Sequence, residues 1–220
     1  MCQGLAQQAW QGLNLPLPAL GDEEGDRVPA GLAVVDAHVH LFPPRVYEAI
    51  WRWFETNAWP IRYQLHAAQA VDFLQARGVQ RIVGLHYAHV PGMARELNRF
   101  VADFAQDRPI VWPLGTVLPG EPDAGDIARE AIEELGLKGL KLHCHVQRFA
   151  VDDPSLDPVW DVCVRNGATV VVHAGREEFR FCLSAIQRRP AGWFDIQIAA
   201  AFIGLEYPAS YSNLISRVLG

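Results

Sequence analysis

The feature that most constrains the fold is a repeated alternation of short apolar runs with longer segments of helical periodicity. The runs are too short to stand alone as helices and lie near glycine or proline, which favours buried strands. Strand and helix units recur about every 28–35 residues, a spacing typical of right-handed βαβ crossovers. We therefore predict an α/β protein with a parallel sheet. The expected strands lie at residues 32–42, 81–85, 110–117, 138–142 and 168–172.

The segments between these strands carry apolar residues at helical spacing. Gly78 and Gly167 follow two of them, at the position where glycine commonly ends a helix. The expected helices lie at residues 45–55, 65–76, 93–104, 126–135 and 155–166.

Histidines concentrate at the carboxyl ends of the expected strands. Active sites of parallel α/β folds gather at this edge of the sheet. Of the eight histidines in the chain, seven follow a strand: His38, His40, His86, His89, His143, His145 and His173. Convergence of imidazoles from separate strands is suited to a divalent metal ion.

The first strand ends in a His-x-His pair. Side chains alternate along a strand, so His38 and His40 share a face with Asp36, whereas Val39 points to the other side. Two imidazoles on one face can each give a nitrogen to a divalent ion at about 2.0–2.1 Å. The alternative is that both rings face solvent or form local hydrogen bonds. The apolar strand before them and the Phe-Pro-Pro sequence after them favour a site.

Composition excludes several classes of protein. The 220 residues are 50% hydrophobic with a net charge of −6, as in a soluble globular enzyme, and no basic stripe suggests nucleic acid. No apolar run approaches the roughly 18 residues that would predict a membrane span. The start lacks a secretion signal and the four cysteines form no C-x-x-C pair, so we expect a reduced, cytoplasmic protein.

Three strand ends resemble the amidohydrolase superfamily. They are DAHVH at residues 36–40, GLKLH at residues 139–143 and VHAG at residues 172–175. The sequence is most similar to the amidohydrolase-related (type 2) branch, which also includes carboxylic-acid decarboxylases. The resemblance covers residues 32–177 and implies a TIM-barrel-like (β/α) fold.

The resemblance also implies a site and a reaction. His38, His40 and His173 would bind a divalent metal, zinc by preference with manganese possible. Family members place a metal-bridging or substrate-contacting group at the end of the fourth strand, and we favour substrate contact for His143 as the catalytic residue. The implied reaction is attack of metal-activated water on a carbonyl, with cleavage of a C–N or C–O bond in a small molecule.

Other polar residues leave alternatives open. Arg176 could bind a substrate carboxylate, or it could pair with Glu177 or Glu178. His145 is equally compatible with a site and a structural role, and His86 and His89 have the pattern of ordinary loop histidines. Because side chains alternate along a strand, Cys144 is expected to point away from His143 and His145 and to pack among apolar residues.

The chain departs from the family pattern at its carboxyl end. A (β/α)8 barrel takes about 250 residues, and the five expected units already occupy residues 32–176. No histidine follows His173, and Asp195 is the only later aspartate. We therefore expect an incomplete barrel, truncated at the C-terminus, with an atypical tail from about residue 178. We also expect residues 1–31 to be a weakly structured leader and residues 32–220 to form one domain.

Two further functions compete with hydrolysis. One is metal-dependent, non-oxidative decarboxylation on the same fold. The other is a catalytically inactive, truncated chain that acts as a binding or assembly subunit. An open barrel would expose strand edges and apolar faces, so association into a homo-oligomer is expected.

Overall fold

The computed structural model describes residues 27–28, 30–57, 61, 63–150 and 152–173. Contacts divide the chain into two units, Met1–Ala174 and Gly175–Gly220, and all described residues lie in the first. The expected tail, Arg176 and most of the expected leader therefore lie outside the described residues.

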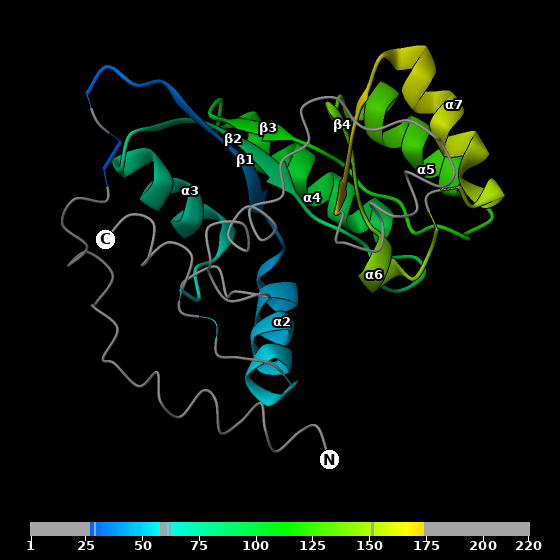
Figure 1. Cartoon of the computed structure of the whole chain (residues 1–220), viewed down its shortest axis with the longest axis horizontal. Coiled ribbons are helices and arrows are strands. Elements are labelled where there is room, and N and C mark those ends of the chain that lie inside the picture. The colour runs from blue at the N-terminus through cyan, green and yellow to red at the C-terminus, as the bar shows by residue number, and fades with distance from the viewer. Residues whose placement is uncertain (1–26, 29, 58–60, 62, 151, 174–220) are drawn as a thin grey trace, which may run out of the picture. The chain divides into compact units, whose positions relative to one another are not determined.

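The described strands are all parallel and follow one another in chain order (Figure 1). They are β1 (Val34–His40), β2 (Val79–Leu85), β3 (Val111–Pro113), β4 (Gly139–His143) and β5 (Thr169–His173). The first three form one sheet and the last two another. Gly115 links them, because its N–H donates to the Gly139 carbonyl at 2.8 Å and its carbonyl accepts from the Lys141 N–H at 2.7 Å.

The helices confirm the predicted alternation. They are α2 (Pro44–Asn57), α3 (Ala67–Ala76), α4 (Ala94–Gln106), α5 (Ala124–Arg129), α6 (Cys144–Gln147) and α7 (Asp157–Asn166), with a 3₁₀ turn, η3 (Pro154–Leu156), before α7. Helices α5 and α7 pack against each other beside β4 (Figure 1). Gly167 ends α7 in the left-handed conformation at φ 58°, which glycine adopts without strain.

Two elements differ from the prediction. The strand expected at residues 110–117 is confined to β3, which ends at Pro113, a residue with no N–H to donate. Beyond it only single contacts continue: the Leu114 N–H donates to the Gly84 carbonyl at 3.0 Å, and Gly115 bridges to Leu140. The helix expected at residues 126–135 changes after α5 into the π-helical turn η2 (Glu130–Glu134). There the Leu135 N–H donates to the Glu130 carbonyl at 2.9 Å, five residues earlier.

Strands β4 and β5 approach each other closely at Gly139. A Cβ atom at this position would lie 1.9 Å from the Thr169 carbonyl oxygen, so a larger residue would push the strands apart. The pairing continues in register to the carboxyl ends, where His143 lies directly opposite His173.

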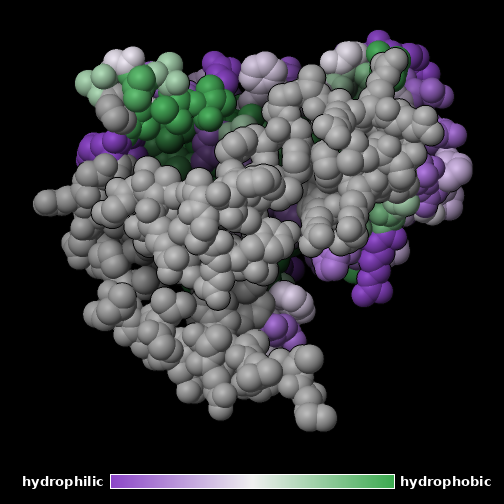
Figure 2. Space-filling view, viewed as in Figure 1, coloured by the Kyte–Doolittle hydropathy of each residue, from purple (hydrophilic) through white to green (hydrophobic). Residues whose placement is uncertain are grey.

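The amino-terminal end of β1 leaves apolar surface exposed. Leu32 and Val35 are each 57% exposed. Figure 2 shows apolar atoms gathered over the start of β1 and the adjoining β2. Within the described residues, no strand pairs with the free edge of β1 or with that of β5. None of the helices in these ranges is long and apolar enough to cross a membrane.

Candidate metal and substrate site

The two histidines at the end of β1 converge, as predicted. The His38 Nε2 and His40 Nε2 atoms lie 3.2 Å apart, and Val39 between them is buried on the opposite face. Two nitrogens bound to one ion at 2.0–2.1 Å would lie about 3.0–3.4 Å apart. Asp36 stabilises the end of β1, because its Oδ1 accepts from the His38 N–H at 3.0 Å where the pairing with β2 is irregular. The spacing of the pair fits a shared metal ion, and it is also the distance of a hydrogen bond between the two rings.

His40 packs against aromatic rings. Its ring stacks on Phe42 with 5.8 Å between centroids and meets the edge of Tyr87 at 5.6 Å. The Tyr47 hydroxyl donates to the His40 carbonyl. Burial and, to a smaller extent, the neighbouring His38 together lower the pKa of His40 to about 3. The imidazole is therefore neutral at pH 7, the form that binds metals.

His143 and His173 form a second pair at the same edge of the fold. Their rings stack with centroids 3.9 Å apart and planes 12° from parallel. Tyr87 joins the two pairs, since its ring also lies 5.1 Å from that of His143. Burial, followed by the neighbouring His173, lowers the pKa of His143 to about 4.

The described residues do not complete a metal-binding set. Across these ranges, no group of three His, Cys, Asp or Glu side chains is arranged to hold an ion. His173 stacks on His143 and its charge influences His38, but it does not form such a group with the first pair. Its role as the third ligand remains a prediction, and so does the role of Arg176.

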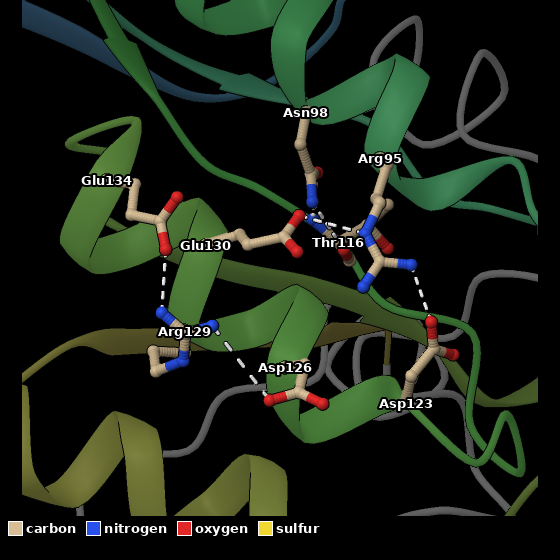
Figure 3. A network of polar contacts seen from close by, with 8 residues as sticks. All are labelled: Arg95, Asn98, Thr116, Asp123, Asp126, Arg129, Glu130 and Glu134. Carbon is tan, nitrogen blue, oxygen red and sulfur yellow. Dashed lines mark hydrogen bonds and ion pairs between the residues drawn. The ribbon is translucent and has the colours of Figure 1, made fainter.

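His86 is not an ordinary loop histidine, contrary to the sequence interpretation, whereas His89 is exposed. His86 is fully buried, and its Nε2 lies 3.0 Å from Asn98 Oδ1. The same oxygen accepts from the Thr116 N–H at 2.8 Å, and Asn98 Nδ2 donates to the Thr116 carbonyl at 2.9 Å (Figure 3). Because the amide oxygen must be the acceptor, His86 carries its proton on Nε2.

This buried network extends to β4, the strand that carries His143. The Thr116 hydroxyl donates to the Lys141 carbonyl at 2.8 Å, so α4, the segment after β3 and β4 are connected. One member of this buried network, Asn98, could have been recognised in the sequence. Asn98 is a polar residue within the apolar stripe of α4, between Leu97 and Val101, and it is buried with them.

Gln147, also missed by the sequence interpretation, connects three strand ends. Its Oε1 accepts from the His143 N–H at 2.7 Å. Its Nε2 donates to the Ala88 carbonyl at 2.8 Å and to the Val117 carbonyl at 2.7 Å. One buried carboxamide thus holds the segments after β2 and β3 against His143.

Burial of His86 predicts a pH dependence of stability. Burial lowers the pKa of His86 to about 4, below the ordinary 6.5, so the unfolded chain binds more protons between these values. The stabilisation is complete above pH 6.5 and is lost as the pH falls toward 4, by about 3 kcal/mol in total. Urea unfolding of metal-free protein from pH 7 to pH 4.5 measures it.

The His86→Leu variant is the control for this measurement. His40 titrates in the same direction in metal-free protein, so the difference between wild type and variant isolates His86. The free energy of unfolding of the variant should fall less steeply with decreasing pH. Equal slopes for the two proteins would contradict the prediction.

A family model described as Amidohydrolase (Amidohydro_2) matches residues 35–216, which include β1 to β5 and most of the remaining chain. The chain belongs to this amidohydrolase family. A curated relative, 2-amino-3-carboxymuconate-6-semialdehyde decarboxylase of Dictyostelium discoideum, is 34% identical over 84 residues. That alignment covers 37% of this chain and 23% of the relative.

Solved structures share the fold. The 5-carboxyvanillate decarboxylase of Sphingomonas paucimobilis matches with a TM-score of 0.51 and 17% identity, over 72% of this chain and 58% of that one. The enzyme of the same name from Novosphingobium aromaticivorans matches with a TM-score of 0.52 and 17% identity, over 79% and 56%. The latter structure contains manganese and 4-hydroxy-3-methoxy-5-nitrobenzoic acid. This chain therefore spans little more than half the length of each of these two structures.

Membership in this family confirms the predicted α/β, TIM-barrel-like fold, and the barrel is incomplete in the described residues. The decarboxylases among the solved structures are enzymes, and one of them contains a divalent metal. The metal in the Novosphingobium structure is manganese, so it gives no specific support to zinc, the metal that the sequence analysis preferred.

Proposed function

We propose that this chain takes part in metal-dependent, non-oxidative decarboxylation of a small carboxylic acid. The observation that carries the proposal is the convergence of the His38 and His40 Nε2 atoms, 3.2 Å apart, beside the stacked His143 and His173 rings. The matched Dictyostelium and bacterial proteins named above are decarboxylases, which favours this reaction over hydrolysis.

His38, His40 and, in this proposal, His173 hold the ion, which is manganese or zinc. When bound, a divalent ion supplies a Lewis acid that orients and polarises the carboxylic acid. The lowered pKa values of His38 and His40 keep both rings ready to bind metal near neutral pH.

His143 contacts the substrate in this proposal. Its Nδ1 accepts from the Val146 N–H at 3.4 Å, which leaves the ring proton on Nε2. The neutral ring can therefore donate a hydrogen bond from Nε2 to a substrate oxygen. The ring of Tyr87, whose centroid lies 5.1 Å from that of His143, adds an aromatic surface that suits a planar acid. Arg176, which follows His173 by three residues in the sequence, would bind a carboxylate.

Release of carbon dioxide tests the proposal. The chain, loaded with manganese or zinc, is incubated with 5-carboxyvanillate and with 2-amino-3-carboxymuconate semialdehyde, and mass spectrometry follows carbon dioxide and the decarboxylated product. A His38→Ala, His40→Ala double variant is the control and should be inactive. Cleavage of amides or esters without release of carbon dioxide would instead support the hydrolase. Metal binding without either reaction would support the non-catalytic subunit.

A further inference from the structure

Lys141 lies at the centre of the candidate site. It occupies the middle of β4, two residues before His143, so both side chains point to the same face of the strand. Leu140 and Leu142 point to the other face, where they belong to the apolar core. Lys141 is fully buried, although lysine is almost never buried unless it has a partner.

The Lys141 ammonium has no partner of opposite charge among the described residues. Its Nζ makes no hydrogen bond there, and the ion pairs in these ranges involve only Arg95 and Arg129 as cations. Its charge is close enough to lower the pKa of His38, His40 and His143, in addition to the larger effect of burial. The ionisable groups that interact with it are three imidazoles and the Cys144 thiol, which raises the pKa of Lys141 by less than burial lowers it. None of them is a carboxylate.

A buried cation without a counter-charge is costly, because burial removes its water and nothing replaces it. A bound carboxylate would supply both the charge and the hydrogen-bond acceptor. The cost of burial would then be recovered only when the ligand is present, which makes recognition selective for anions.

We propose that Lys141 is the anion-recognition residue of this site and binds the carboxylate of a small organic acid. The inference rests on the proposed function for the location of the site, and it adds the residue that recognises the carboxylate of the ligand. Neutral molecules of the same shape bind more weakly, because they leave the Lys141 ammonium uncompensated.

Binding of a non-reacting pair of ligands tests this inference. 4-Hydroxybenzoate and 4-hydroxybenzamide have the same shape and differ in charge. Isothermal titration calorimetry measures both, on the protein as purified and after removal of metal. We expect wild type to bind the carboxylate at least tenfold more tightly than the amide in both states. Loss of this preference after metal removal would assign recognition to the metal and overturn the proposal.

Variants at position 141 test whether Lys141 is the residue that binds the carboxylate. Lys141→Met keeps the length and removes the charge, and it should weaken carboxylate binding at least tenfold while amide binding is unchanged. Lys141→Gln is the second variant, with the same expectation, in case the first does not fold. Lys138→Met, at an exposed lysine just before the strand, is the matched control and should bind as wild type does. Unchanged carboxylate binding in a folded position-141 variant would overturn the proposal.

The experiment separates the two proposals. Carboxylate binding that depends on Lys141, without release of carbon dioxide from any acid, would retain the anion site and reject the decarboxylase. Release of carbon dioxide by wild type and Lys141→Met with equal KM would retain the decarboxylase and reject the role of Lys141.

Discussion

Replacing both His38 and His40 with alanine will lower the affinity for a divalent metal at least 100-fold and abolish stoichiometric binding. The two Nε2 atoms are 3.2 Å apart, so each would contribute one ligand to the same ion. Loss of a single supporting residue around a metal already costs 10–100-fold in affinity, and loss of two ligands costs more. Equilibrium dialysis followed by elemental analysis measures the effect.

Two exposed histidines at the same edge of the fold provide the control. His89 follows β2 and His145 follows β4, and neither is buried. The His89→Ala, His145→Ala double variant removes the same number of imidazoles and should retain the metal. Equal loss of metal in both double variants would mean that binding is not specific to the end of β1.

Replacing Asn98 with leucine will lower the free energy of unfolding by about 4 kcal/mol, because each buried polar group left without a partner costs about 1–3 kcal/mol. Leucine has a similar volume but leaves His86 Nε2–H unpaired, together with the N–H and carbonyl of Thr116. Urea unfolding at pH 7 measures the loss.

The matched control lies one turn earlier on the same helix. Arg95 pairs with Asp123 at 2.5 Å and with Glu130 at 2.8 Å, but these side chains are partly exposed (Figure 3). Arg95→Met should therefore cost no more than about 1 kcal/mol. A comparable loss for the two variants would show that the Asn98 network contributes no more than a surface ion pair.

Periodicity and the positions of histidines predicted much of this architecture. The apolar runs identified all five described strands, and strand alternation correctly placed His38 and His40 on one face, opposite Val39. These features depend on local pattern, which a single sequence carries. The shortening of β3 and the π-helical turn were not predicted, because both depend on which backbone groups find partners.

The buried polar residues could not be assigned in the same way. His86 bonds to Asn98, 12 residues away, and Gln147 bonds to the Ala88 carbonyl, 59 residues away. Nothing in the neighbouring sequence specifies such partners, since tertiary packing brings them together. Lys141 lay within the GLKLH segment that indicated the family, but its burial without a counter-charge is visible only in three dimensions.

The carboxamide of Gln147 has a consequence for how such a site can diversify. It clamps the chain after β2 and β3 to the amide of His143 through three hydrogen bonds. A shift of any one of these segments would break its hydrogen bond to the carboxamide. We therefore expect new ligand preferences at this site to arise by exchange of side chains, because an insertion that displaces one of the segments would cost these hydrogen bonds.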